Sequence, residues 1–153
     1  MADMVLTAGG IPAMGAAAIA KVRHLESMAR RLPQVAIETR HVIHAGLYAR
    51  TIVVPAGVMI TGALIRIATL LIVEGDVIVY VDGVPVHVRG YAVLPASAGR
   101  KQAFVAQADT RLTMVFPTSA KTVEQAEREF TDEIYLLGSR HGAAANHVVI
   151  TGE

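Results

Sequence analysis

Three histidines of this chain lie where acid–base or metal chemistry could use them. His41 and His44 are three residues apart, a spacing that occurs in metal sites, and His87 follows on a later predicted strand. Residues three apart on a strand point to opposite faces, so His41 and His44 cannot bind one ion unless a bulge intervenes. We therefore expect them to be hydrogen bonded separately. The alternative is a relocated site in which His41 meets His87 inside a barrel, beside Glu38 or Glu74.

Other reactive groups are few. Tyr48, Tyr80 and Tyr91 fall on predicted strands, where they could act as acids or line a pocket, and where tyrosine is also ordinary packing. Ser97 stands in a loop with neither a nucleophile-elbow motif nor a Walker pattern around it. The chain has no cysteine, which excludes thiol chemistry, disulfides and zinc–thiolate sites.

The composition points to association between chains. Of 153 residues, 53% are hydrophobic and 18% are charged, and the mean hydropathy is +0.46. Exposed apolar patches drive association, so subunit interfaces are the expected place for the apolar surplus. The net charge of +1 predicts no nucleic-acid partner. Arg30-Arg31 and Arg100-Lys101 are predicted to be solvated pairs. Arg66, the lone charge in an apolar run, is predicted to be paired across an interface, at a barrel mouth, or with Asp76 or Glu74, and a structural pairing is the default.

Neither a membrane span nor a signal peptide is predicted. No run of about 18 apolar residues lacks Gly, Pro or a charge. Asp3 comes early, and the first positive charge, Lys21, follows the apolar run instead of preceding it. We therefore expect no membrane partner and a cytoplasmic site of folding.

The periodicity divides the chain into an N-terminal arm and helix (1–33), a β-barrel (34–118) and a C-terminal helix and tail (119–153). Residues 1–15, rich in Gly, Ala and Met, are predicted to be held down by a neighbouring subunit. A helix is predicted over 16–32, with one apolar stripe formed by Ile19, Val22, Leu25, Met28, Ala29 and Leu32.

The C-terminal helix is predicted over 122–137, because Thr122 and Gln125 form a capping box. Its acidic stretch, 124–133, is predicted to be a solvated outer face. Residues 148–150 are predicted to be a β-prone tail, so both ends of the chain provide extended arms.

The barrel is predicted from alternation and turn residues. Strands are predicted over 35–43, 48–54, 77–81, 84–88, 104–105 and 112–116, and the apolar run 58–73 is predicted to be buried on both faces. Asp82-Gly83 predicts a hairpin, and Pro85 predicts an edge strand. Asp76, like Asp82, is assigned to a turn. The fold class is therefore mainly β.

The stretch from Pro55-Ala56-Gly57 through Glu74-Gly75-Asp76 and Asp82-Gly83 to Gly99 resembles the cupin superfamily. That resemblance implies a cupin-like, jelly-roll β-barrel, in which relatives hold a metal on three histidines and a glutamate. The corresponding positions here are Ala63, Ile65, Thr69 and Gln102. Alanine and isoleucine have no lone pair, and threonine and glutamine are poor ligands. We therefore predict no metal, no cofactor and no catalytic residue at this place.

Several further segments are similar to small cupin-like proteins of bacteriophage and prophage genomes. They are the segment His44–Thr51, the run Gly62-Ala63-Leu64, the segment from Gly90-Tyr91 to Leu94-Pro95, and Ala108-Asp109-Thr110. This likeness implies a virion protein assembled in the host cytoplasm. Many of those proteins carry histidines after the Gly-Ala-Leu run, where Ile65 and Thr69 stand here.

The leading hypothesis is a non-enzymatic structural protein of a phage virion, acting in capsid decoration, cementing or another particle-assembly role. Its partners would be itself, as a homotrimer or dimer, and other virion proteins such as the major capsid protein. One alternative is a metal-free isomerase or epimerase that uses His41 or His87 with a tyrosine. The other is a small-ligand-binding barrel with a pocket lined by Leu64, Ile72 and Val79.

Overall fold

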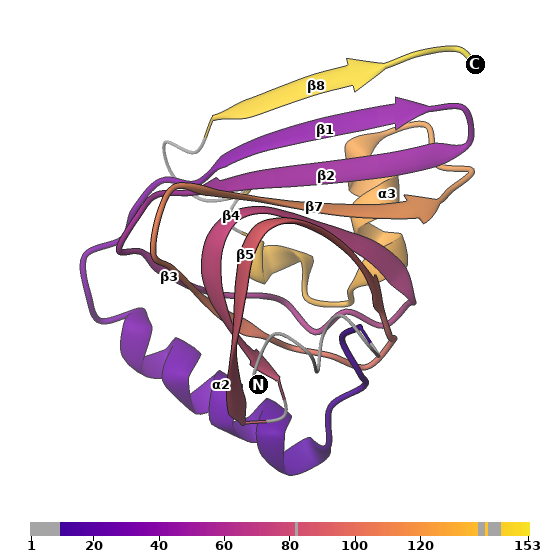
Figure 1. Cartoon of the computed structure of the whole chain (residues 1–153). Helices are drawn as coiled ribbons and strands as arrows, with labels where there is room; N and C mark the ends of the chain where they lie inside the picture. Colours follow the sequence, from indigo (N-terminus) through magenta and orange to yellow (C-terminus); the bar gives the residue numbers. More distant parts are fainter. Residues whose placement is uncertain (1–9, 82, 138–139, 141–144) are drawn as a thin grey trace.

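The structure is a computed structural model and describes residues 10–81, 83–137, 140 and 145–153. Its centre is one curled sheet of eight strands in the order β3-β6-β4-β7-β2-β1-β8, with β5 paired to β4 (Figure 1). The strands are β1 (Glu38–His44), β2 (Leu47–Val54), β3 (Met59–Thr61), β4 (Thr69–Val81), β5 (Val84–Ala96), β6 (Ala103–Ala106), β7 (Thr110–Pro117) and β8 (Asn146–Ile150).

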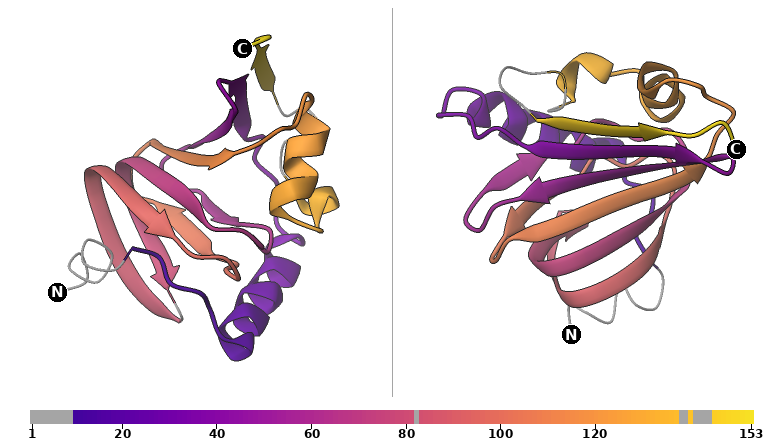
Figure 2. Two further views of the ribbon diagram at one scale, coloured as in Figure 1. Left: turned by 90° about the vertical axis from the view of Figure 1, so that its right-hand side faces the viewer. Right: turned by 90° about the horizontal axis from the view of Figure 1, so that it is seen from above.

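Two α-helices accompany the sheet. The helix α2 (Ala16–Ala29) precedes the first strand, and α3 (Val123–Phe130) follows the seventh. In the left view of Figure 2 both helices lie toward the open side of the curl. The prediction of a mainly β fold flanked by an N-terminal and a C-terminal helix is confirmed. Within the described residues, no helix has the length and apolar character needed to span a membrane.

Alternation decides which side chains enter the core. On β1, Thr39, His41 and Ile43 are buried while their neighbours are exposed or half-buried. Tyr48 and Val54 are the corresponding fully buried residues of β2. Because successive strand residues point to opposite faces, one face of the sheet packs inward and the other faces out.

The longest strands differ from their prediction. The sequence Glu74-Gly75-Asp76 lies within β4 and pairs with Tyr91, Gly90 and Arg89 of β5, so the turn assigned to Asp76 is wrong. The apolar run 58–73 is also not one doubly buried strand: β3 ends at Thr61, and β4 begins at Thr69. The β4–β5 hairpin is confirmed by the pairing of Val81 with Val84, whereas the position of Asp82 lies outside the described residues.

The C-terminal helix is shorter than predicted. Thr122 caps it by accepting a hydrogen bond from the Gln125 amide, as the capping box indicates. The helix ends at Phe130, because Thr131 is extended, and a single 3-10 turn, η1 (Ile134–Leu136), follows. Ala126 and Phe130 are buried against the inner face of the sheet, in agreement with the apolar spacing.

The N-terminal segment is held by its own chain. Ile11 is fully buried, its amide donates to the carbonyl of Pro95 over 2.8 Å, and its carbonyl accepts from Ser97 over 2.8 Å. Gly10 has a φ of +69°, and a Cβ there would lie 2.0 Å from the Pro95 oxygen. For residues 10–15, the prediction that a neighbouring subunit holds the arm is therefore wrong. Residues 1–9 lie outside the described part.

Two further corrections concern helix α2 and the basic pairs. Met28 and Leu32 are 53% and 64% exposed, so the buried stripe of α2 is narrower than predicted. Arg100 and Lys101 are buried, and only Arg30-Arg31 is a solvated pair. The ammonium of Lys101 donates to Gly62 of the barrel and to Glu26 of α2, which ties the helix to the sheet.

The C-terminal tail forms β8 and pairs in parallel with β1 of the same chain. The prediction of a β-prone tail is confirmed, but in this structure the strand extends the sheet of its own chain. Figure 1 shows β8 at the end of the sheet, beyond β1.

Candidate functional site

The sequence resemblance assigns four residues to the metal-ligand positions of cupins: Ala63, Ile65, Thr69 and Gln102. Ile65 pairs with Arg100 in an isolated bridge, and the amide of Gly62 donates to Gln102 over 2.8 Å. Thr69 and Gln102 are buried. Ala63 is also buried and lies in the same cluster as Ile65. The side chains at these positions are therefore mainly buried, and two of the four are hydrocarbon.

A cation lies beside these residues. The Arg100 guanidinium donates to Thr69 Oγ1 over 2.8 Å and to the carbonyl of Ser97 over 2.7 Å. Burial lowers the pKa of Arg100 to about 10. Among the described residues, no carboxylate forms a salt bridge with it, and its buried neighbour Gln102 has an Nε2 atom without a hydrogen-bond partner.

These residues do not fit a metal. Two of the four positions are hydrocarbon, and a fixed guanidinium would repel a cation placed between them. In the described part of the chain, no three His, Cys, Asp or Glu side chains come together as a possible ligand set.

A buried, hydrogen-bonded histidine, His41, lies on the inner face of the sheet. Its ring is 1% exposed, with Nδ1 2.7 Å from the hydroxyl of Tyr48 and Nε2 2.8 Å from Oδ1 of Asn146. The amide oxygen of Asn146 only accepts, so Nε2 carries the proton and Nδ1 accepts from Tyr48. Burial lowers the pKa of His41 and raises that of Tyr48, which keeps both groups neutral.

An ion triad adjoins this pair, in which Arg50 and Glu127 are buried and Arg140 is exposed. Glu127 of α3 accepts from Arg50 over 2.9 Å and from Arg140 over 2.5 Å, and its side chain is 3% exposed. The predicted solvated face of the helix is therefore wrong at Glu127. A groove of about 260 Å³ opens here between α3 and β8, and it is lined by His41, Val123, Glu124, Glu127, Arg140, Asn146 and Val148.

The other histidines lie elsewhere. His44 points outward and bonds Thr151 over 2.7 Å, so it shares no site with His41, as the strand geometry predicts. His87 contacts Asp76 on the outer face of the β4–β5 hairpin, while His41 is buried on the inner face. The relocated site that would join His41 and His87 is therefore not formed.

The predicted apolar pocket is not formed either. Val79 is fully buried in the core, whereas Ile72 occupies the alternate, outward-facing register of the same strand. Residues seven apart on a strand point to opposite faces, so Ile72 and Val79 cannot line one pocket with Leu64.

Arg66 forms a structural ion pair, as predicted, but its partner is Asp132 and not Asp76 or Glu74. Its guanidinium donates to Asp132 over 2.7 Å and also reaches backbone oxygens at the end of α3, among them that of Glu129 over 3.1 Å. The contact fastens the segment before β4 to the end of the helix.

The most extended chemical feature of the molecule is an apolar row on the outer face of the sheet. Strand register places six apolar residues side by side on six neighbouring strands, and we call them the outer apolar row: Pro95, Leu70, Val115, Ala49, Val42 and Val149. Leu70, Val42 and Val149 are 47%, 39% and 56% exposed. No element of the described chain covers this row.

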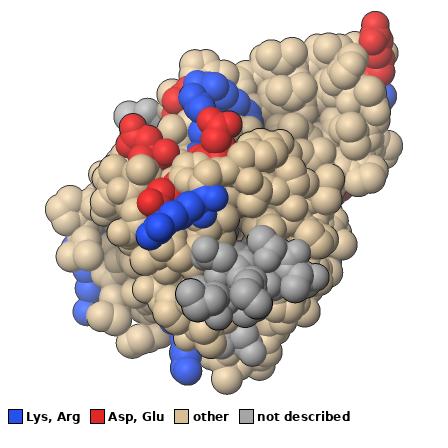
Figure 3. All heavy atoms as spheres, in the orientation of Figure 1, with Lys and Arg blue, Asp and Glu red and all other residues tan. Residues whose placement is uncertain are grey.

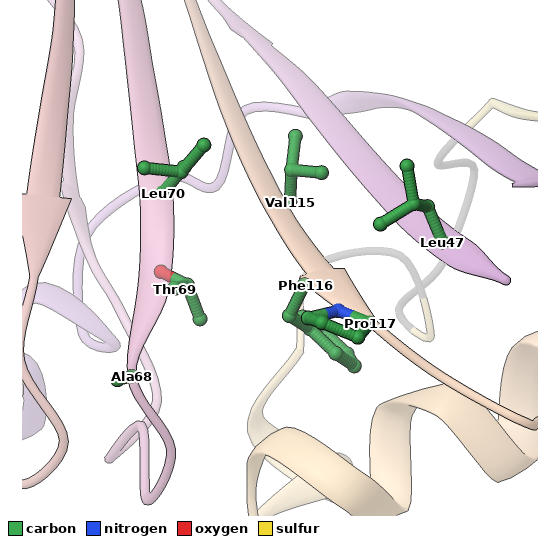
Figure 4. Close-up of a pocket in the computed structure, with 7 residues that line it drawn as sticks. All are labelled: Leu47, Ala68, Thr69, Leu70, Val115, Phe116 and Pro117. Carbon is green, nitrogen blue, oxygen red and sulfur yellow. The ribbon is translucent and has the colours of Figure 1, made fainter.

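A shallow groove of about 370 Å³ follows the row. Its walls are formed by Leu47, Leu70, Val115 and other residues at the ends of three strands. Figure 4 shows the side chains of Leu47, Val115 and Leu70 pointing to the same side of the sheet, with Phe116 turned away from them. On the side of the molecule drawn in Figure 3, the charged side chains gather in a small group with wide uncharged areas around them.

Neither a protein-family model nor a curated protein matches this chain. Among solved structures, a cupin 2 conserved barrel domain protein from Leptotrichia buccalis is 10% identical with a TM-score of 0.46, and the match covers 57% of this chain and 44% of that protein. The cupin 2 domain of an XRE family transcriptional regulator from Enterobacter cloacae is 9% identical with a TM-score of 0.45, covering 54% and 99%.

Ectoine synthase from P. lautus is 15% identical with a TM-score of 0.48, and the match covers 65% of this chain and 76% of that protein. The first two of these three carry the name of the superfamily that the sequence resembles. The curled sheet described above is the feature of this chain that agrees with the predicted fold class. The three solved structures are similar to this chain in fold.

Sequence reasoning missed the inward cations and their carboxylate partners. Arg100, Lys101 and Glu127 sit in polar stretches that look solvated in sequence, and only their partners show why they are buried. The sequence held one signal of this kind. Arg50 lies two residues after Tyr48 on the same predicted strand, so both side chains point to the inner face.

Proposed function

We propose that this chain is a non-enzymatic assembly protein that acts as a homo-oligomer, and that its setting is a phage virion, in decoration, cementing or another particle contact. The observation that carries the proposal is the outer apolar row. A row of apolar residues that crosses six strands and is covered by nothing in the described chain has the character of an interface.

The row fits a second copy of the same chain. Its exposed members are uncharged, so two copies related by a two-fold axis would meet without like charges facing each other. Burial of apolar side chains stabilises such a contact by about 25 cal/mol per Å² removed from water. The shallow groove beside Leu70 would receive side chains of the partner.

The inner face supports the same function. His41 has both ring nitrogens occupied and is almost fully buried, so it has no free position at which to take a proton from a substrate. Of the four residues that the resemblance assigns to the ligand positions, Thr69 binds the Arg100 guanidinium, which the carbonyl of Ser97 also holds. Polar groups on the inner face thus serve the packing of the barrel.

The virion setting comes from the resemblance to phage-encoded cupin-like proteins. A small, stable barrel with an apolar outer face is suited to binding repeated surfaces, such as those of a major capsid protein. Identification of the protein in purified particles, at a fixed ratio to the capsid protein, would support this setting. Its absence from particles of a phage that expresses it would overturn the virion part of the proposal.

The self-association is tested by native mass spectrometry of the untagged chain and of Leu70→Glu. A charge within the row should lower the oligomeric state, because a carboxylate would be buried against apolar atoms. The matched control is Met28→Glu, which places the same charge on an equally exposed apolar residue of α2. The control should keep the wild-type mass. A monomeric wild-type chain, or equal masses for Leu70→Glu and wild type, would contradict the proposal.

A second candidate, a metal-free acid–base enzyme, is favoured by one observation, the 2.7 Å contact between His41 and Tyr48 beside a groove. It requires that His41 be released from Asn146 before it could act. Binding of a small molecule to the groove, blocked by His41→Gln, would favour this candidate over the first.

A further inference from the structure

The last strand of the sheet has an open edge. β8 pairs with β1 on one side and with no other described strand on the other. All five of its residues are exposed, and the backbone edge that points away from β1 has no described partner. In the left view of Figure 2, β8 stands at the rim of the sheet. A bare edge presents unpaired backbone N–H and C=O groups to any strand that can approach.

The other two edges of the sheet are protected in ways that β8 is not. β3 is only three residues long, which gives a partner little to pair with. β5 carries Pro85 and Pro95, and near its end Ala96 is bridged by Ile11 of the same chain. Short strands, prolines and covering segments are the usual means of preventing edge association. The sequence of β8, Asn146–Ile150, contains no Pro, Gly, Lys or Arg.

The register decides which groups of β8 face outward. The carbonyl of Ala145 accepts from Thr39 of β1, and the amide of Thr151 donates to Ile43. In a parallel ladder the bonding residues of one strand alternate. The odd-numbered residues of β8 therefore face β1, and the backbone groups of Asn146, Val148 and Ile150 face the open edge.

We propose that the open edge of β8 pairs antiparallel with β8 of a second copy, across a two-fold axis at Val148. This register uses all three outward residues, because it sets Val148 opposite Val148 and Asn146 opposite Ile150 of the partner. The contact is isologous and closes on itself, so it forms a pair of chains without a growing fibre. The partner is a second copy because the segment is uncharged apart from His147 and is complementary to itself.

This inference rests on the proposed self-association and extends it. The outer apolar row reaches β8 at Val149, so the two contacts are adjacent but use different parts of the sheet, its face and its edge. A five-residue strand pair alone buries less than the roughly 1,000 Å² of a stable interface. The edge contact therefore adds to the face contact, and two isologous contacts with perpendicular axes close a tetramer.

The first test is Val148→Pro, measured by native mass spectrometry beside wild type and Leu70→Glu. Proline removes the outward N–H at the centre of the seam and leaves the β1 ladder its odd-numbered partners. Wild type should be larger than a dimer. Val148→Pro should be a dimer held by the face contact, and both Leu70→Glu and the double variant should be monomers, because the edge contact alone is too small to hold two chains together. If Leu70→Glu lowers the mass and Val148→Pro does not, the edge contact is wrong and the proposed function stands.

The second test keeps the strand intact. The chain has no cysteine, so Val148→Cys introduces one thiol per chain. Mild oxidation should join two chains through position 148, seen as a dimer on a non-reducing gel and lost on reduction. Met28→Cys, equally exposed on α2, controls for random collision and should stay largely monomeric on the gel. Equal cross-linking of the two variants would overturn the antiparallel seam even if Val148→Pro reduced the mass by disordering β8.

Discussion

The guanidinium of Arg100 donates a hydrogen bond to the hydroxyl of Thr69 over 2.8 Å, so a buried positive charge binds one of the four positions at which cupins carry metal ligands. The same guanidinium also contacts Met114 Sδ, at 3.9 Å, on the inner face of β7. The place that the cupin resemblance assigns to a metal is thus adjoined by a cation of the chain itself.

This arrangement predicts that metal chelation leaves the protein unchanged. Dialysis against EDTA should not alter the thermal midpoint, and added Zn²⁺ or Ni²⁺ should not raise it. A resident metal at a hundred times its Kd would add about 2.7 kcal/mol to the free energy of unfolding, which is several degrees in Tm. Differential scanning calorimetry with and without chelator makes the measurement, and a drop of that size after chelation would contradict the interpretation.

Two glutamates of α3, Glu127 and Glu124, allow the contribution of the ion triad to stability to be compared with that of an exposed ion pair. Glu127→Ala should lower the free energy of unfolding by about 3–5 kcal/mol, because Arg50 and Arg140 would lose the carboxylate between them. Glu124→Ala removes an exposed contact with Arg128 one turn earlier and should change stability only within experimental error. Urea unfolding at pH 7 compares the two. Similar losses for both variants would show that the helix, and not the triad, is the sensitive element.

The burial of His41 predicts that the free energy of unfolding falls as the pH is lowered. Burial lowers its pKa in the folded state, so below its ordinary value of about 6.5 the unfolded chain binds the proton more readily. Its contribution is therefore fully present above pH 6.5 and is lost as the pH falls toward the folded pKa. In His41→Gln this part of the pH dependence should be absent.

The measurement for His41 is the free energy of unfolding at a series of pH values between 5 and 8. The difference in the free energy of unfolding between the wild type and His41→Gln should shrink as the pH falls. Val42→Gln, a substitution at the neighbouring outward position of β1, should keep the wild-type slope. A slope that is the same in all three proteins would mean that His41 does not titrate with unfolding.

The conformation and packing of Gly10 predict that adding a single methyl group there lowers the stability of the fold. Gly10→Ala should lower the free energy of unfolding by about 2 kcal/mol or more, because the positive φ is strained for alanine and the Cβ would overlap the Pro95 carbonyl. Gly15→Ala, at a φ of −71° with nothing within 4 Å, should cost less than about 1 kcal/mol. Thermal unfolding of both variants tests the docking of the N-terminal segment on its own barrel.

The same docking changes the prediction for the arm. If residues 1–15 lay on a neighbour, their deletion would weaken assembly and leave the barrel stable. Because Ile11 is fully buried in the core of its own chain, the deletion should instead lower the thermal midpoint of the barrel. Stability and oligomeric state measured on the same truncated protein separate the two outcomes.

Local patterns determined a large part of this protein. Period-two alternation at 37–43 and 48–54 specified which residues of β1 and β2 face inward, because a strand forces neighbouring side chains to opposite faces. Thr122 with Gln125 specified the start of α3, and Asp82-Gly83 the β4–β5 hairpin, through short-range backbone geometry. The change of residue type at Ala63 and Ile65 is also readable from sequence alone.

Only the tertiary structure decided where long-range partners meet. Gly75 continues a strand instead of turning because Gly90 of β5 lies opposite it. Glu127 and Lys101 are buried because partners far away in sequence neutralise them, and their own neighbours in the chain carry no sign of this. The row from Pro95 to Val149 exists because register aligns six strands, and register is set by the whole sheet and not by any one of its strands.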